Sequence, residues 1–260
     1  MSNHYFQFKQ FKIEQEKCAM KVCTDSCLFG AWIKVNESVK SILDIGTGTG
    51  LLSLMLAQKS SAHVHGIEID ENAFLQTIEN FENSAWNERL TAYHGDVKAF
   101  DFSQTFDFIV CNPPFYENEV DSKMHEEKIA KHSLHLTLSY LMSAIENLLH
   151  ADGKFAILLP YYRKDEFEKL AAQHSFYPGQ TLFIKQTPAH DFFRYAAVFT
   201  KENSTNNQHE EISIKVKGKP VNLTKEYTFV ACEREGDPDT TICRVEGVAE
   251  PTRLGSTLHK

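Results

Sequence analysis

Four consecutive residues, Asn112-Pro113-Pro114-Phe115, follow a run of apolar residues and bring together groups that could position an amine. The two prolines fix the backbone and remove two N–H donors, which leaves the Asn112 side-chain oxygen and the Pro113 carbonyl as acceptors. Two rigid acceptors can hold both hydrogens of a planar NH₂ group and direct its lone pair toward an electrophile. Because an attacking amine becomes cationic, such acceptors would stabilise the transition state more than the ground state.

Aromatic side chains follow these acceptors. Phe115, or Tyr116 in its place, offers a face on which a planar base could stack, an interaction worth about 1–3 kcal/mol per base. The same four residues would also suit a turn that ends a strand and packs a phenylalanine into the core, since Asn-Pro pairs commonly start turns. The functional residues elsewhere in the chain favour the first interpretation.

A glycine-rich segment at residues 43–50, with the sequence LDIGTGTG, indicates a ligand-binding loop. Gly46, Gly48 and Gly50 allow positive φ angles and let a ligand approach the backbone closely. The N-terminus of the helix expected after this loop favours negative charge. We therefore expect a nucleotide-like cofactor, although a glycine-rich turn without function would have a similar sequence.

Acidic residues around the loop indicate which cofactor it binds. Glu68 ends the second apolar run, 18 residues after Gly50, and could accept hydrogen bonds from ribose hydroxyls; Asp70 is the alternative. The nicotinamide fingerprint GxGxxG is not met, because Leu51 occupies the position of its third glycine. Asp44 precedes the loop, where a carboxylate could hold an ammonium group. Dinucleotides have no such cation, whereas S-adenosylmethionine has an amino group and a sulfonium.

A third carboxylate is expected at the same edge of the sheet. Asp96 closes the third apolar run in the sequence His94-Gly95-Asp96. Open α/β sheets bind ligands at the carboxyl ends of their strands, so Asp96 could accept a hydrogen bond from an adenine amino group. A turn or helix-cap aspartate would fit the sequence equally well.

The elements that must position these residues alternate between strand and helix patterns, as expected of βαβ units in a parallel α/β sheet. Strands are predicted at residues 41–45, 63–69, 89–95, 106–111, 153–160, 180–186 and 192–200, the last two as a closing antiparallel pair. Helices are predicted at residues 49–59, 71–86, 134–150 and 163–175. Residues 201–211 are polar without periodicity and are expected to form a loop or linker before ISIKV and a turn at KGKP.

Size and composition are those of one globular domain. The 260 residues contain neither a secretion signal nor an apolar run long enough to span a bilayer, so we expect a soluble, cytoplasmic protein. The six cysteines match neither CxxC pairs nor zinc spacings, and the histidines form no metal grouping; we expect reduced thiols and no metal. The net charge of −8 excludes a uniformly basic nucleic-acid binder but not a local basic patch.

Together, the glycine loop and the Asn112–Phe115 tetrapeptide resemble the class I S-adenosylmethionine-dependent amino-methyltransferases, marked by D/N-P-P-Y/F after the fourth strand. The resemblance covers residues 40–200 and implies a Rossmann-like sheet of seven mostly parallel strands with helices on both faces. It assigns catalysis to the tetrapeptide, including Pro114. The residues that it assigns to the cofactor in this part of the chain are Asp44, Gly46, Thr47, Gly48, Gly50, Glu68, Ile69, Asp96, Val97 and Asn112.

The N-terminal residues FKQFKIEQEKCAMKVCTDSCLFGAW (8–32) resemble the segment that opens the bacterial valine-tRNA adenine N6-methyltransferases, which modify adenosine 37 beside the anticodon. In that family the segment lies over the cofactor, so the resemblance implies that Lys21, Thr24 and Asp25 contribute there. Cys23 departs from the family's usual glycine. The phenylalanines of this segment could also simply pack against the domain.

The expected organisation is an N-terminal segment (1–40) over the site, a methyltransferase domain (41–231) and a tail (232–260) without periodicity, expected to be disordered. The resemblance implies methyl transfer to an adenine in the anticodon loop of a tRNA. A ribosomal guanine N2-methyltransferase, a protein glutamine methyltransferase and an inactive RNA-binding scaffold remain alternatives. The sequence does not determine the oligomeric state, although a monomer is slightly favoured.

Overall fold

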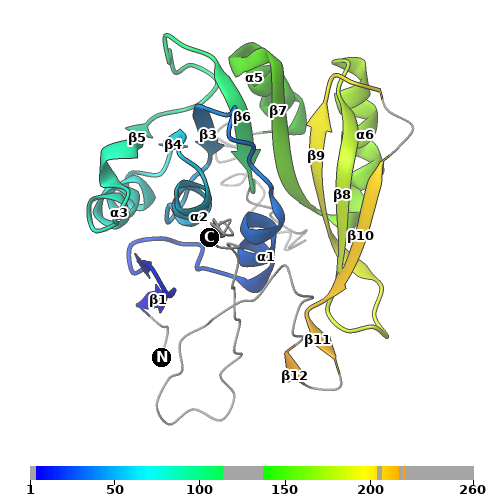
Figure 1. The fold of residues 1–260 in the computed structure, drawn as a ribbon, viewed down its shortest axis with the longest axis horizontal. Coiled ribbons are helices and arrows are strands. Elements are labelled where there is room, and N and C mark those ends of the chain that lie inside the picture. Colours follow the sequence, from blue (N-terminus) through cyan, green and yellow to red (C-terminus); the bar gives the residue numbers. More distant parts are fainter. Residues whose placement is uncertain (1–3, 114–136, 204–206, 217–218, 221–260) are drawn as a thin grey trace, which may run out of the picture.

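The computed structural model describes residues 4–113, 137–203, 207–216 and 219–220. Its centre is an eight-stranded sheet in the order β10-β8-β9-β7-β6-β3-β4-β5 (Figure 1). The strands of this sheet are β3 (Ser41–Ile45), β4 (His63–Glu68), β5 (Leu90–His94), β6 (Phe106–Cys111), β7 (Leu149–Pro160), β8 (Tyr177–Lys185), β9 (Phe192–Thr200) and β10 (Gln208–Ser213). The strand β9 runs antiparallel to its neighbours β7 and β8, and the other pairings are parallel.

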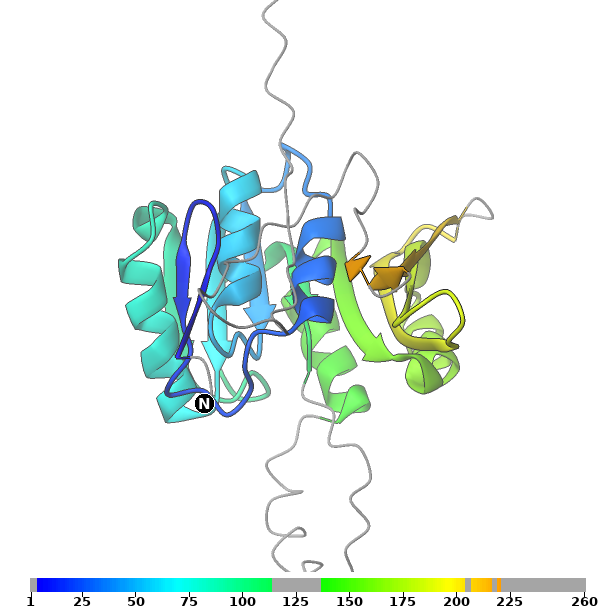
Figure 2. The same ribbon diagram turned by 90° about the horizontal axis from the view of Figure 1, so that it is seen from below.

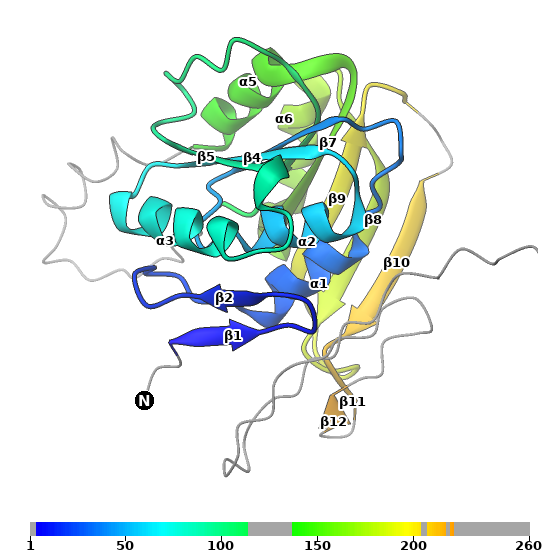
Figure 3. The ribbon, with the colours of Figure 1, turned by 60° about the vertical axis from the view of Figure 1, so that its left-hand side comes forward.

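Helices cover both faces of this sheet, which confirms the expected α/β Rossmann-like fold (Figure 3). The helices are α1 (Thr24–Trp32), α2 (Leu51–Lys59), α3 (Glu71–Glu82), α5 (Leu138–Leu148) and α6 (Lys164–Gln173), with short 3₁₀ turns at Asn87–Arg89 and Tyr161–Arg163. One face carries α1, α2 and α3, and the other carries α5 and α6. The chain therefore buries both faces of a mostly parallel sheet, as such sheets require.

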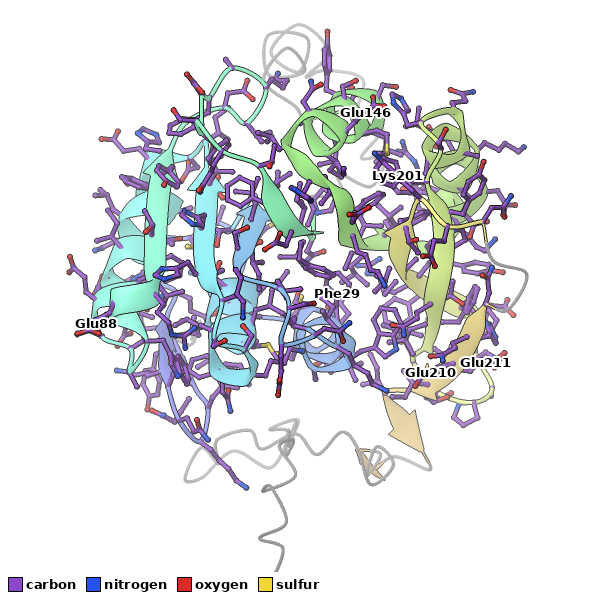
Figure 4. The ribbon with its side chains drawn as sticks, turned by 45° about the horizontal axis from the view of Figure 1, so that its top comes forward. Phe29, Glu88, Glu146, Lys201, Glu210 and Glu211 are labelled. Atoms are coloured by element: carbon purple, nitrogen blue, oxygen red, sulfur yellow. The ribbon has the colours of Figure 1, made fainter. Side chains whose placement is uncertain are left out.

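Alternating side chains of the strands pack into two apolar cores, one on each face of the sheet. In β3, Ile42 packs in the core with α1 and α2, whereas Leu43 packs in the core with α5 and α6. This alternation follows from the two-residue repeat of a strand. Phe29 of α1 is fully buried near the centre of the molecule, whereas Glu88 and Glu146 lie at its edge (Figure 4).

The N-terminal residues form a hairpin, β1 (Tyr5–Gln7) and β2 (Lys12–Glu14), beside α3 (Figure 2, Figure 3). The Asn80 side chain of α3 accepts from the Glu14 amide and donates to the Glu14 carbonyl, both at 2.8 Å. Phe8 stacks on Phe11 with ring centroids 4.4 Å apart. The expected packing of these phenylalanines is thus present, and it holds the following segment close to the sheet.

The sheet departs from expectation at β10, at β7 and at β8, which begins at Tyr177 rather than at residue 180. Residues 208–213 form an eighth strand that pairs in parallel with β8, although the loop predicted at 201–211 included the first four of them. Its side chains are mostly polar because it is an edge strand; backbone pairing and the bond from Trp32 Nε1 to Glu210 Oε1 at 3.1 Å hold it. The fifth strand begins at Leu149 rather than at residue 153, because Leu149 pairs with Phe106 on β6. A short hairpin, β11 (Lys215–Val216) and β12 (Lys219–Pro220), spans the expected turn.

The expected tail, residues 232–260, lies outside the described residues, so the structure bears on neither this boundary nor the disorder expected there. None of the helices in the described part of the chain is both long and apolar enough to cross a membrane.

Candidate active site

The site lies where the strand order reverses, between β3 and β6. Neighbours on the two sides of β3 are β4 and β6, and Ile45 pairs with both Ile67 and Cys111. Gly46 and Asn112 each follow one of these paired residues, so they leave the sheet side by side. Such a reversal opens a crevice at the carboxyl ends of the strands, where α/β proteins bind ligands.

A cavity of about 380 Å³ opens at this edge. It brings together ten residues that the sequence predicted for cofactor binding: Lys21, Asp44, Gly46, Thr47, Gly48, Glu68, Ile69, Asp96, Val97 and Asn112. Three other residues expected at the cofactor, Thr24, Asp25 and Gly50, do not line it. Pro113 is buried next to Asn112, whereas Pro114, Phe115 and Tyr116 lie outside the described residues.

The glycines of the loop differ in what surrounds them. Gly46, Gly48 and Gly50 all have positive φ, at 70°, 59° and 79°. A Cβ at Gly46 would meet no atom within 4 Å, and one at Gly48 would meet only the Gly46 carbonyl oxygen at 4.0 Å. At Gly50 it would lie 2.7 Å from a ring carbon of Phe81. Gly46 and Gly48 thus leave open space beside the cavity, whereas Gly50 is needed for packing at the start of α2.

Asp44 places a buried carboxylate in the cavity wall. Its Oδ2 accepts from Thr47 Oγ1 at 2.8 Å and from Ser53 Oγ at 2.7 Å, while its Oδ1 is buried without a hydrogen-bond partner among the described residues. Burial raises the pKa of Asp44 to about 6, although the hydroxyl donors oppose this rise. A buried acceptor that lacks a donor is costly, and a cationic ligand in the cavity would supply one.

Glu68 faces the same cavity from the end of β4. Its Oε2 accepts from the Gly48 amide at 2.9 Å, and its Oε1 accepts from the amides of Ile69 and Asp70 at 2.9 and 3.0 Å. These bonds fix the carboxylate and leave lone pairs for further donors. Asp70, the alternative considered from sequence, also lines the cavity, but its Oδ1 caps α3 by accepting from the Ala73 amide at 2.8 Å.

Asp96 is a turn residue, one of the two alternatives that the sequence left open, and it also lines the cavity. It lines the cavity, and its carboxylate also accepts from the Lys98 amide at 3.0 Å and pairs with the Lys98 ammonium at 3.1 Å. The turn that follows is closed by the amides of Ala99 and Phe100, which donate to the Asp96 carbonyl at 2.9 Å. Asp96 is therefore at once a turn residue and part of the cavity wall.

Residues 18–22 form one side of the cavity, although the sequence pointed only to Lys21 among them. The Lys21 ammonium donates to the carbonyl of Gln15, and the Gln15 side chain accepts from the Val22 amide at 2.8 Å. The segment is therefore held by its own polar groups. Cys18 also lines the cavity, and because burial raises the pKa of its thiol to about 11, it is a neutral group at pH 7 rather than a nucleophile.

Asn112 is half-buried, and a helix far away in the sequence holds its carboxamide. Asn112 Nδ2 donates to Ser26 Oγ at 2.8 Å, and Ser26 itself lines the cavity. No sequence signal pointed to Ser26, because the contact joins residues 86 positions apart. The other lining residues that sequence reasoning missed are Cys18, Ala19, Met20, Val22, Ile45, Thr49, Leu51, Leu52, Ile67, Ala73 and Gly95.

The described residues contain no group of three or more His, Cys, Asp or Glu side chains suited to a metal. Cys18, Cys23, Cys27 and Cys111 are free thiols. The site instead combines an acceptor for a cation at Asp44, a fixed carboxylate at Glu68, open backbone at Gly46 and Gly48, and a carboxamide at Asn112. This set fits a ligand that carries both an ammonium group and ribose hydroxyls, as S-adenosylmethionine does.

Comparison with known proteins places the chain among methyltransferases. Residues 20–142 match the family described as Methyltransferase small domain. A tRNA1(Val) (adenine(37)-N6)-methyltransferase from Flavobacterium psychrophilum is 39% identical over 225 residues, which cover 85% of this chain and 95% of the relative. A protein of the same name from Photorhabdus laumondii is 36% identical over 204 residues, which cover 77% of this chain and 83% of that one.

Solved structures share the fold at low sequence identity. A predicted O-methyltransferase from Agrobacterium tumefaciens superposes with a TM-score of 0.56 at 14% identity, over 74% of this chain and 88% of its own. Pyrococcus horikoshii TYW2, solved in complex with MeSAdo, has a TM-score of 0.52 at 15% identity, over 78% of this chain and 74% of its own. These likenesses concern the fold alone.

Proposed function

The chain belongs to the family of tRNA1(Val) (adenine(37)-N6)-methyltransferases, and on this premise we propose that it transfers a methyl group from S-adenosylmethionine to N6 of adenosine 37 in valine tRNA. The observation that carries the proposal is that Asn112 lines the same cavity as Asp44, Glu68 and the glycine loop. One cavity thus holds the groups suited to a methyl donor and the group suited to an amine. A cytoplasmic location belongs to the same proposal.

The cofactor is held by groups whose chemistry matches its own. Asp44, with Oδ1 unpartnered among the described residues, accepts from the ammonium group, and Glu68 accepts from the ribose hydroxyls. Gly46 and Gly48 leave the backbone open to close approach. Asp96, which also pairs with the Lys98 ammonium, accepts a hydrogen bond from the amino group of the cofactor's adenine. When bound, S-adenosylmethionine supplies an electrophilic methyl group.

Asn112 and Pro113 position the adenine amine. The Asn112 side-chain oxygen and the Pro113 carbonyl accept its two hydrogens, which directs the nitrogen lone pair toward the methyl group. Their effect grows as the nitrogen becomes cationic, so they lower the barrier without a strong base. The target base must first leave its stack, at a cost of a few kcal/mol. Phe115 or Tyr116 stacks on the extruded base in this proposal.

The proposal is tested by following a tritiated methyl group. The protein is incubated with labelled S-adenosylmethionine and a transcript of valine tRNA, a transcript in which adenosine 37 is replaced by guanosine, or a mixture of ribosomal proteins and release factors. We expect label in the first sample only. Label in the protein mixture with silent RNA would indicate a glutamine methyltransferase. A further sample with ribosomal RNA tests the guanine methyltransferase, and no label in any of the four samples would favour an inactive scaffold.

A further inference from the structure

The first turn of α1 reaches the predicted catalytic amide of Asn112. Ser26 is 6% exposed, and its Oγ accepts from Asn112 Nδ2 at 2.8 Å. The contact joins α1 to the end of β6 and lies in the wall of the cavity. A partly buried hydrogen bond in this position restricts how the Asn112 side chain can rotate.

The Ser26 hydroxyl can accept from Asn112 whether its other neighbour, Cys23, donates to it or accepts from it. A hydroxyl has one hydrogen and two lone pairs. Cys23 Sγ lies 2.9 Å from Ser26 Oγ, and either atom can donate. Whichever donates, the Ser26 oxygen keeps a lone pair for Asn112 Nδ2. Fixing the nitrogen end of a planar carboxamide also fixes the direction in which its oxygen points.

A partly buried ion pair holds this turn of α1 in place. Asp25 Oδ1 accepts from the Ser26 amide at 3.1 Å, and Arg194 Nε donates to Asp25 Oδ2 at 2.7 Å. Arg194 lies on β9 opposite Pro160, the last residue of β7, and β7 pairs directly with β6. The ion pair therefore ties the helix that carries Ser26 to the same edge of the sheet that carries Asn112.

We propose that Ser26 is a positioning residue for methyl transfer, whose hydroxyl orients the Asn112 carboxamide so that Oδ1 faces the amine of the substrate. This inference rests on the proposed function of Asn112. It requires no contact between Ser26 and the reacting atoms. Its consequence is that removal of the hydroxyl harms the reaction only while Asn112 is present.

The test is a double-mutant cycle between Ser26→Ala and Asn112→Ala. Single-turnover methylation of valine tRNA is measured with tritiated cofactor at saturating concentrations, over hours so that slow variants remain measurable. Misplacement of a reacting group can cost up to about a hundredfold in rate, so we expect Ser26→Ala to be about 10- to 100-fold slower. Asn112→Ala should be at least about a hundredfold slower, and adding Ser26→Ala to it should change the rate less than about twofold.

Ser84→Ala is the matched control. Ser84 is also a buried serine, at 9% exposure, whose Oγ donates to the Phe81 carbonyl at 2.8 Å, but it does not line the cavity. Its rate should equal that of the unmodified protein. Cofactor affinity, measured by calorimetry, should change by less than about threefold in Ser26→Ala, since a positioning role acts on the rate of the chemical step.

Three results would overturn the inference: an unchanged rate in Ser26→Ala, a loss that appears only as weaker cofactor binding, or an equal loss from Ser26→Ala with and without Asn112. An unchanged rate in Asn112→Ala would instead refute the role given to Asn112 under the proposed function. Failure of the positioning role and failure of the function are thus distinguishable.

Discussion

Asp44 is the residue whose environment says most about the ligand. It is 1% exposed, and one of its carboxylate oxygens has no partner among the described residues. Its pKa of about 6, against an ordinary value of 3.8, means that the folded chain keeps the proton to higher pH than the unfolded chain does. The stability of the ligand-free protein therefore falls as the pH rises through this range. A bound ammonium group would stabilise the ionised Asp44 carboxylate and so remove this loss of stability.

This reversal gives a pH dependence of cofactor binding. Because the ammonium group binds the ionised carboxylate, the affinity for S-adenosylmethionine should rise about tenfold per pH unit below pH 6 and level off above it, where Asp44 is already ionised. Calorimetric titrations between about pH 5 and pH 8 measure this directly. Asp44→Asn should bind more weakly and lose the slope. The same slope in Asp44→Asn would assign the titration to another group.

At the residue scale, the sequence located the polar groups of the site but not what supports them. Asp44, Glu68 and Asn112 could be predicted because each ends an apolar run, and parallel strands bring their carboxyl ends to one edge. Ser26 could not be predicted. Its distance from Asn112 depends on how α1 packs against the sheet, which no local pattern in the sequence records.

The loop between β3 and α2 is the element on which the cofactor site depends. Neighbouring elements fix its backbone: the amides of Gly46 and Thr47 donate to the Ile67 carbonyl at 2.9 and 3.1 Å, and Thr77 of α3 donates to the Gly48 carbonyl at 2.7 Å. A loop fixed in this way keeps its positive φ angles without a ligand. The open space at Gly46 is thus built into the fold.

Alanine substitutions at two glycines of this loop should separate binding from folding. Gly46→Ala carries the strain of positive φ, about 1–2 kcal/mol, and its methyl group would enter the open space that the cofactor is proposed to occupy. We therefore expect at least about a tenfold loss of cofactor affinity. Gly50→Ala adds a clash with Phe81, so its free energy of unfolding should fall by about 2–5 kcal/mol. Urea unfolding and calorimetry measure the two effects. Unweakened cofactor binding by Gly46→Ala would mean that the ligand does not occupy this space.

At the element scale, prediction succeeded where side-chain patterns decide the structure. The bounds of β3, β6 and β9 were as expected, because short apolar runs bounded by polar or turn residues mark buried strands. It was wrong for β10, whose polar residues give no periodic pattern and which exists through pairing with β8. The N-terminal hairpin was not predicted either, since its bonds to Asn80 join residues 66 positions apart.

At the scale of the whole molecule, the net charge of −8 opposes a polyanionic substrate at long range. Recognition of tRNA must therefore depend on local groups and on the shape of the substrate. Two parts of the fold build the site. The rigid sheet edge supplies the cofactor cavity and Asn112, while the N-terminal segment, held by α3, closes one side of that cavity.

The central claim is that this edge of the sheet presents a methyl group to an exocyclic adenine amine. Nucleoside mass spectrometry of bulk tRNA, incubated with the protein and isotope-labelled S-adenosylmethionine, tests this claim directly, because it identifies the methylated atom. The account predicts labelled N6-methyladenosine as the product, and its absence with Asn112→Ala. Label on a guanine, on a ring atom of adenine or on a ribose would contradict it.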